Sequence, residues 1–489
     1  MLFNSASFAI FLPIVFLLYW FVFQRNLKVQ NLFVIVASYV FYGWWDWRFL
    51  LLIAFTSFCS WSCGLLMQRT DNQKNASFVS YRKFLSVSNI VVNLGVLGVF
   101  KYYNFFVESF ISAFASVGLH LQPSTLKIIL PIGISFYTFQ ALSYSIDVYK
   151  RKIEPTKDII AFFAFIGFFP LLVAGPIERA TNLLPQFYKK RTFDYKKAVD
   201  GMRQILWGLF KKIVIADNCA VYVDAVFGNP HDQTGSTLLL AVVFFTFQIY
   251  ADFSGYSDIA IGTARLFGIN AMRNFAFPYF SRDIAEFWRR WHISLTTWFR
   301  DYVYIPLGGS RVSKPKVIRN TLIVFLISGL WHGANWTFIA WGLFHALLFL
   351  PLILLGKNRK HTNIVAERSV FPNVKEIFQM GLTFFLVVIS WVFFRADNIG
   401  QAFDFLQKIF LHQSLQVFSI NYLIDIAPTA LLIVFFICVE WIGRRNEYAI
   451  AGIGKTRNRM IRWTFYSFLI FLIGMYAFVG NQQFIYFQF

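Results

Sequence analysis

Long runs of apolar residues without a charged side chain constrain this chain more than any other feature. Such runs cover residues 8–23, 32–45, 49–67, 87–100, 238–250 and 347–355. A helix that crosses a bilayer needs roughly 20 mostly apolar residues, because lipid offers its side chains no polar partners. The shorter runs must therefore extend into their flanks, re-enter the membrane or lie along its surface.

The composition agrees with a membrane protein. Hydrophobic residues make up 57% of the 489 residues and charged residues only 14%, which is too little charge to cover a water-soluble core. We expect an all-α fold, a polytopic transmembrane helical bundle with re-entrant and interfacial helices. No compositional linker or internal repeat divides the chain, so we expect one domain over residues 1–489 with about eleven to thirteen membrane segments.

The charge distribution predicts an orientation. The chain has 45 Lys and Arg residues against 24 acidic residues, and basic stretches recur between nearly uncharged segments. The first basic residue, Arg25, follows the first apolar run, the reverse of a signal peptide, which places the N-terminus outside the cytoplasm. The net charge of +21 is better explained by membrane topology and contact with anionic lipids than by binding of nucleic acid. A basic cytoplasmic face would also attract a polyanionic donor.

The four cysteines, Cys59, Cys63, Cys219 and Cys438, form no CxxC pair. We predict neither a disulfide framework nor a metal site. The sequence also lacks a GxSxG elbow, a Walker loop and an HExxH motif.

Helix-breaking residues interrupt two apolar regions. Pro131 and Gly133 fall within residues 130–137, and Pro170 and Gly175 fall within residues 167–179. Non-helical backbone at membrane depth persists only where protein or a water-filled cavity satisfies it. A cavity or tunnel and a pair of kinked packing helices fit this pattern equally well.

Residues 248–258 place acidic side chains inside an apolar segment. Ionisable groups at membrane depth cost about 2.5 kcal/mol or more, so they need a reason to be there. The segment forms either a polar cavity wall or a helix-end network in which the carboxylates pair with arginines elsewhere. We favour the paired network for Asp258, and both interpretations stay open for Asp252.

Residues 287–301 alternate tryptophan with arginine, a pattern typical of a helix lying along a membrane interface. His292 lies inside it, with Trp288 one turn before and Thr296 one turn after. An interfacial histidine is more often an ordinary polar residue than a catalytic one. The pattern alone therefore favours a structural role for His292.

His332 lies in an uncharged apolar segment, between Gly329 and Gly333 and near the amide of Asn335. Neutral imidazole can take a proton from a hydroxyl nucleophile and return it to a leaving group. A satisfied core histidine and a catalytic one are equally compatible with this setting. We expect His345, thirteen residues later, to hydrogen-bond between helices.

These segments resemble those of a known family. It is similar to the membrane-bound O-acyltransferases, and among them to the bacterial branch that O-acetylates alginate and peptidoglycan. The resemblance covers essentially the whole chain, through residues 1–5, 41–45, 131–140, 174–179, 208–212, 252–258, 287–309, 328–335 and 484–489. Residues 287–309 and 328–335 are its most specific parts.

The resemblance implies a site. His332 matches the near-invariant catalytic histidine of the family, and His292 matches a second position that is often histidine in this branch. In relatives these residues line a central tunnel, with donor entering from the cytoplasm and acceptor from outside. We expect Trp331, Asn335, Asp252 and Ser328 to line the tunnel, and Arg289 and Arg290 to contact the phosphates of the donor.

The resemblance also implies a function. The expected enzyme transfers acetyl from acetyl-coenzyme A, without a resident cofactor, across a bacterial inner membrane to an extracytoplasmic glycan. Transfer is either direct or through a periplasmic O-acetyltransferase or acetyl-carrier partner, and a covalent acyl-enzyme stays possible. The acceptor is open between exopolysaccharide, peptidoglycan and lipopolysaccharide, with D-alanyl transfer to teichoic acid less favoured. A polysaccharide flippase and a non-catalytic scaffold are the alternatives.

Overall fold

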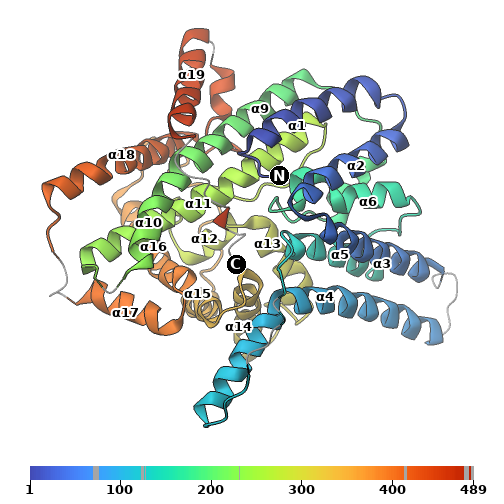
Figure 1. The fold of residues 1–489 in the computed structure, drawn as a ribbon, viewed down its shortest axis with the longest axis horizontal. Coiled ribbons are helices and arrows are strands. Elements are labelled where there is room, and N and C mark those ends of the chain that lie inside the picture. The colour runs from blue at the N-terminus through green and yellow to red at the C-terminus, as the bar shows by residue number, and fades with distance from the viewer. Residues whose placement is uncertain are drawn as a thin grey trace. The chain divides into compact units, whose positions relative to one another are not determined.

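The computed structural model describes residues 1–69, 76–122, 126, 128–230, 232–411, 416–456, 458–477 and 484–485. These residues form helices, turns and loops without a strand, which confirms the expected all-α fold (Figure 1). Within the described residues, six helical segments are long and apolar enough to cross a membrane, so the chain is a multi-pass membrane protein: Leu27–Arg69, Tyr81–Ser116, Gly235–Leu266, Trp336–Leu354, Val374–Arg395 and Ile420–Gly443. The larger expected count also includes shorter, interfacial and re-entrant segments and stays a prediction.

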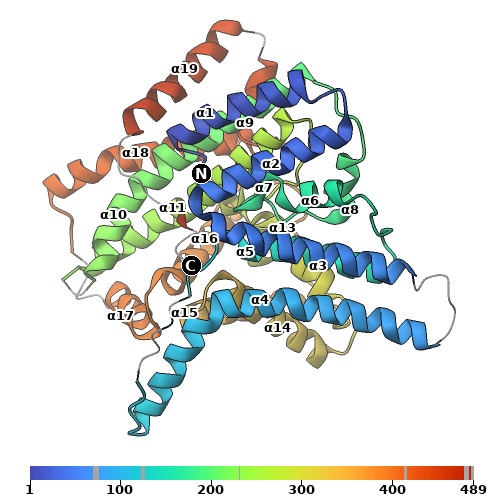
Figure 2. The same cartoon turned by 45° about the vertical axis from the view of Figure 1, so that its right-hand side comes forward.

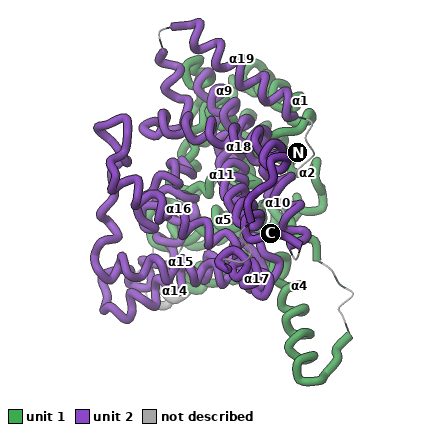
Figure 3. The backbone as a smooth tube through the Cα atoms, turned by 90° about the vertical axis from the view of Figure 1, so that its left-hand side faces the viewer, with its two compact units in different colours: residues 1–198, 263–272 green, residues 199–262, 273–489 purple. Residues whose placement is uncertain are grey.

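Two compact units are distinguished by the contacts within the chain (Figure 3). Unit 1 comprises Met1–Ala198 and Thr263–Met272, and unit 2 comprises Val199–Gly262 and Arg273–Phe489. The expected single domain stays a prediction.

Unit 1 contains the first eight α-helices. In Figure 2, α3 and α4 run beside each other, and both pack against α5. The α-helices and the short π- and 3₁₀-helices (η) are α1 (Ala6–Leu17), η1 (Leu18–Val22), α2 (Leu27–Asp46), η2 (Trp47–Phe49), α3 (Leu50–Arg69), α4 (Ala76–Ser116), α5 (Ile134–Tyr149), α6 (Ile159–Gly167), α7 (Phe169–Leu172), α8 (Ala180–Leu183) and η3 (Leu184–Phe187).

Both regions with helix breakers contain non-helical backbone. Gly133 precedes α5 with a φ of 77°, and α6 ends at Gly167. Residues 173–179 are buried and non-helical. A Cβ on Gly133 would lie 2.7 Å from the carbonyl oxygen of Leu172, so the two irregular segments pack directly on each other. Glycine is needed at this position both for its φ and for this close approach.

Unit 2 contains the remaining helices. The helices α9 and α11 begin or end a few residues inside unit 1. In chain order they are α9 (Tyr195–Leu209), η4 (Phe210–Ala216), α10 (Asp217–Gly228), α11 (Gly235–Leu266), η5 (Pro278–Phe280), α12 (Ile284–Arg290), α13 (Ile293–Phe299), η6 (Arg300–Tyr304), α14 (Lys314–His332), α15 (Trp336–Leu354), α16 (Val374–Arg395), α17 (Ile399–Phe410), α18 (Ile420–Gly443), η8 (Ala451–Lys455) and α19 (Arg459–Tyr476).

The helical hairpin of α14 and α15 carries His332 and is held by glycines. A Cβ on Gly329 would lie 2.3 Å from the carbonyl oxygen of Phe338, and one on Gly342 would lie 2.4 Å from that of Phe325. Small residues allow two helix backbones to approach this closely, as in other membrane helix pairs. The hairpin therefore holds the end of α14 in a fixed position.

Candidate functional site

His332 is the last residue of α14, and its side chain is 3% exposed. Aromatic rings surround the imidazole: the centroid of the Trp341 ring lies 5.1 Å away and that of Phe394 lies 5.4 Å away. Helices α15 and α16 supply these two rings. The surroundings are buried and aromatic, so a proton-transfer group here interacts strongly with any charge that develops beside it.

His292 lies next to it, although forty residues separate the two in sequence. The centroids of the two imidazole rings are 6.3 Å apart, with planes inclined by 62°. His292 is fully buried, and the ring of Phe253 packs edge-on against it at 4.7 Å. The structure therefore brings together the two histidines that the sequence singles out.

The expected continuous interfacial helix through residues 287–301 is wrong. Helix α12 ends at Arg290 and α13 begins at Ile293, with His292 between them in the left-handed region at φ 44° and ψ 54°. A non-glycine residue there is under backbone strain, and such strain concentrates at functional sites. The break turns the imidazole into the interior of unit 2, where an uninterrupted helix along an interface would not bury it.

Asn274, which no motif in the sequence marks, fixes the orientation of this imidazole. Its Oδ1 lies 3.1 Å from Nδ1 of His292, and it accepts hydrogen bonds from the backbone N–H and the hydroxyl of Ser294. Its Nδ2 donates to the hydroxyl of Ser257 over 3.0 Å. Because the N–H of Ser294 can only donate, the amide oxygen must face it and His292, which assigns the proton to Nδ1 of His292 and the lone pair to Nε2.

Burial also sets the protonation state of His292, which lies outside the six candidate spans. It lowers the pKa of His292 to about 3, because removing the imidazolium from water disfavours the charged form. His292 is therefore neutral at physiological pH. A neutral ring with its lone pair on Nε2 can accept a hydrogen bond.

The other residues expected near the tunnel take different positions. Trp331 is buried beside both histidines, with its ring 5.7 Å from that of His292 and 5.0 Å from that of His332. Ser328 is buried one turn before His332 on α14. Asn335 caps α15 by accepting from the N–H of Thr337, and its Nδ2 donates to the carbonyl of Asp397. That these residues line a tunnel stays a prediction.

Asp252 belongs to a buried ion network. Its Oδ1 lies 2.9 Å from Nζ of Lys212, which lies 2.7 Å from Oδ1 of Asp217. The N–H of Ile485 donates to its Oδ2 over 2.6 Å. The resemblance at residues 484–489 thus falls partly inside this core, while its residues 486–489 lie outside the described chain.

Asp258 is paired, as predicted, but its partner is a lysine. Nζ of Lys211 lies 2.6 Å from Oδ2 of Asp258, and Gln204 donates to Oδ1 over 2.7 Å. The expected arginine partner is therefore wrong. Lysine fits here because its ammonium also donates to the hydroxyl of Ser254 over 2.9 Å.

The two arginines expected to contact the donor differ. Arg290 forms an ion pair with Glu286 at 2.8 Å, and the same carboxylate pairs with Arg282 at 3.0 Å, so the charge of Arg290 is partly balanced inside the fold. Arg289 is exposed, and it donates to the carbonyl oxygens of Asn358 and His361, which are neutral. Arg289 thus keeps its positive charge available to an anion. Donor contact at either residue stays a prediction.

His345 hydrogen-bonds between helices, as expected. Nε1 of Trp288 on α12 lies 3.3 Å from its Nδ1, and the hydroxyl of Ser390 on α16 lies 3.0 Å from its Nε2. The indole can only donate, so Nδ1 is the acceptor and Nε2 carries the proton. His345 is therefore committed to holding α12, α15 and α16 together.

Comparison with known proteins identifies the family of this chain. Residues 37–391 match the membrane-bound O-acyltransferase family, and both histidines fall inside the match. The chain is 41% identical to the probable alginate O-acetylase AlgI of Pseudomonas aeruginosa over 423 residues, which covers 86% of this chain and 77% of that protein.

Two further relatives extend the comparison. The chain is 35% identical to the peptidoglycan O-acetyltransferase of Helicobacter pylori over 436 residues, covering 83% of this chain and 79% of the relative. It is 29% identical to the teichoic acid D-alanyltransferase of Bacillus subtilis over 250 residues, covering 48% of this chain and 62% of the relative. The match to the peptidoglycan O-acetyltransferase covers more of the chain and has the higher identity of these two.

Proposed function

Because the chain belongs to the membrane-bound O-acyltransferase family, we propose that it acetylates hydroxyl groups of an extracytoplasmic polysaccharide at a centre formed by His292 and His332. Membership of this family identifies the protein as an acyltransferase. The O-acetylase and peptidoglycan O-acetyltransferase relatives support acetyl as the acyl group and a glycan as the acceptor.

The observation that carries the proposal is the pair of buried imidazoles 6.3 Å apart. A single buried histidine is common in proteins that do not use it for catalysis. Here two buried histidines lie together although forty residues separate them in sequence, and one of them has a strained backbone. This arrangement supports a shared catalytic function. A hydroxyl nucleophile needs a base, and neutral imidazole is suited to this near pH 7.

In this mechanism His332 is the general base. An imidazole nitrogen of His332 takes the proton from the acceptor hydroxyl as its oxygen attacks the acetyl carbonyl of the thioester. The tetrahedral intermediate then collapses, the carbon–sulfur bond breaks, and the same proton passes from His332 to the leaving sulfur. The products are an acetate ester and a thiol. General base catalysis of this kind contributes about 10²- to 10⁴-fold to the rate.

His292 acts as a hydrogen-bond acceptor. Its proton on Nδ1 is committed to Asn274, so its Nε2 can only accept a hydrogen bond. A neutral His292 therefore cannot polarise the acetyl carbonyl, which would need a donor. Its role in the proposal is to hold an N–H or O–H group of its neighbours or of the acceptor in position, and Asn274 is a positioning residue that acts through it.

The donor in the proposal is acetyl-coenzyme A, reaching the site from the cytoplasm past the exposed charge of Arg289. The enzyme then lies in a bacterial inner membrane with its N-terminus outside. A periplasmic acetyl-carrying or acetyl-transferring partner would receive the group when transfer to the glycan is indirect.

The test is the amount of base-labile acetate per unit glycan in a deletion strain. Wild type and His120→Ala, a change at an exposed loop residue, should both restore acetate, and His332→Ala should restore almost none at equal membrane abundance. Unchanged glycan yield in all strains would exclude a flippase. Near-normal acetate with His332→Ala would contradict the catalytic assignment and favour a scaffold.

A further inference from the structure

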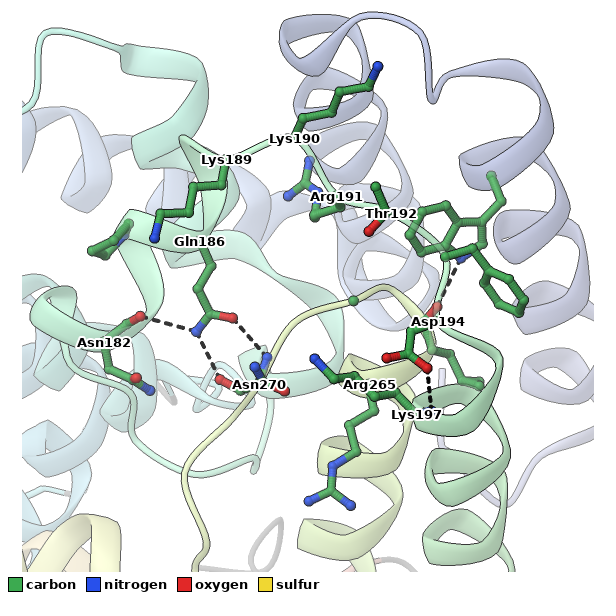
Figure 4. A pocket seen from close by; sticks show the side chains of 15 residues that line it. Asn182, Gln186, Lys189, Lys190, Arg191, Thr192, Asp194, Lys197, Arg265 and Asn270 are labelled. Carbon is green, nitrogen blue, oxygen red and sulfur yellow. Dashed lines mark hydrogen bonds between the residues drawn. The ribbon is translucent and has the colours of Figure 1, made fainter.

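Unit 1 holds a basic cavity of about 490 Å³ that the proposed reaction does not use (Figure 4). Its walls come from the segment that connects η3 to α9, the start of α9, the end of α11 and the residues after it. The volume is within the range of about 300–1,000 Å³ typical of small-molecule sites. Its basic lining residues are Lys189, Lys190, Arg191, Lys197 and Arg265.

Hydrogen bonds fix the walls of this cavity. Gln186 and Asn270 are joined twice: Nε2 of Gln186 donates to the carbonyl of Asn270 over 3.0 Å, and the N–H of Asn270 donates back to Oε1 over 2.8 Å. Nε1 of Trp20 donates to the carbonyl of Leu266 over 2.9 Å. The cavity is therefore preformed, which lowers the entropic cost of binding a ligand.

The lysines of the cavity are not neutralised by the protein. Asp194 is the one acidic residue in its lining, and its Oδ1 accepts from the backbone N–H groups of Lys196 and Lys197 at 2.9 and 3.1 Å. Within the described part of the chain, Lys189, Lys190 and Lys197 form no ion pair. Figure 4 shows Lys189 and Lys197 on different walls, with Lys190 turned away from both.

Arg191 supplies an independent indication of a missing anion. Its side chain is buried, at 5% exposure, yet its partners are neutral amides: Nε and Nη2 donate to Oε1 of Gln30, and Nη2 also donates to Oδ1 of Asn31. Nη1 has no hydrogen-bond acceptor among the described residues. A buried guanidinium without a counter-charge is costly, and an anion in the cavity that it lines would offset that cost.

We propose that this cavity binds a phosphate-bearing anion, either the headgroup of an anionic phospholipid or a phosphate group of a water-soluble ligand. Phosphate offers several strong acceptor oxygens, which lysine ammonium and arginine guanidinium groups bind through charge-assisted hydrogen bonds. The positive-inside rule would explain a basic cytoplasmic segment at residues 189–197, but not why Lys189, Arg191 and Lys197 line one preformed cavity. Both sources of phosphate are available on the cytoplasmic side.

The full-length protein in detergent tests this with one probe for each source. Native mass spectrometry would measure binding of phosphatidylglycerol against phosphatidylcholine, and calorimetry would measure binding of inorganic pyrophosphate. The test variant is Lys189→Gln with Lys197→Gln. The matched control, Lys196→Gln with Lys316→Gln, removes the same charge at exposed positions outside the cavity.

We expect one probe to bind wild type and the control within about twofold of each other, and to bind the test variant at least about tenfold more weakly. Selective binding of phosphatidylglycerol would identify a lipid site, and binding of pyrophosphate would identify a site for a soluble phosphate. The proposal is overturned when neither probe binds wild type, or when both double variants lose binding equally. Neither result bears on acetyl transfer, which is measured separately.

Discussion

Replacing Asn274 with leucine should slow acetyl transfer without abolishing it. The change removes the acceptor 3.1 Å from Nδ1 of His292 and leaves the hydroxyls of Ser294 and Ser257 without this partner. A neutral buried hydrogen bond contributes about 0.5–1.5 kcal/mol net, so releasing the ring from one tautomer should lower the rate roughly 2- to 12-fold. The unsatisfied groups should lower the free energy of unfolding by about 1–3 kcal/mol.

The conservative change Asn274→Asp separates orientation from packing. An aspartate keeps an acceptor for Nδ1 of His292 and should restore much of the rate. Its negative charge would also raise the pKa of His292 from about 3, because an opposite charge stabilises the imidazolium. The rate of Asn274→Asp should therefore fall as the pH is lowered through this raised pKa, in a range where wild type keeps its rate.

The assay is the initial rate of radiolabelled acetyl transfer from acetyl-coenzyme A to polymer in inverted membrane vesicles, measured across pH and normalised to membrane-inserted protein. The reasoning is refuted when Asn274→Leu transfers acetyl within twofold of wild type. It is also refuted when the leucine and aspartate variants are equally slow with the same pH profile, because a packing role alone gives that result.

Three further predictions concern stability, measured by thermal unfolding in detergent. Gly329→Ala should cost about 1–3 kcal/mol by separating α14 from α15, while Gly381→Ala, where a Cβ meets nothing within 4 Å, should be neutral or stabilising; equal effects would contradict the close approach. Asp258→Asn should lower the free energy of unfolding by about 3–5 kcal/mol, because Lys211 loses the carboxylate that pairs with it at 2.6 Å. Adding Lys211→Met should recover part of this loss, and a double variant as unstable as the single one would contradict the prediction. Burial raises the pKa of Glu178 from 4.5 to about 7. The stabilisation from its protonated form is therefore fully present below pH 4.5, and the free energy of unfolding falls as the pH rises through about 7. Glu178→Gln should flatten this fall, and an unchanged pH dependence would contradict the prediction.

The sequence predicts much of the fold because its strongest signals are local. Charge-free apolar runs indicate membrane helices, and Pro131 and Gly133 indicate an irregular segment that the structure contains. His345 was expected to bridge helices and does so. The pairing of Asp258 was also foreseen, since an ionisable group in an apolar segment needs a partner.

The site is less predictable because its geometry is tertiary. Residues 287–301 suggest one interfacial helix, and no local signal marks the left-handed break that buries His292. Asn274 lies in a segment without periodicity, so only the folded chain shows that it holds the imidazole. The charge balance of Arg290 likewise depends on Glu286 being in place four residues earlier with suitable geometry. Sequence spacing cannot reveal that two histidines forty residues apart lie side by side.

The central claim is that His292 and His332 serve one chemical step, and a double-mutant cycle tests it most directly. Acetyl-transfer rates of His292→Ala, His332→Ala and the double variant would be measured in the same vesicles at equal protein abundance. Residues that act as a unit are strongly non-additive, so the double variant should be no slower than the slower single variant. Losses that multiply, or a His332→Ala variant with a near-normal rate, would contradict the claim.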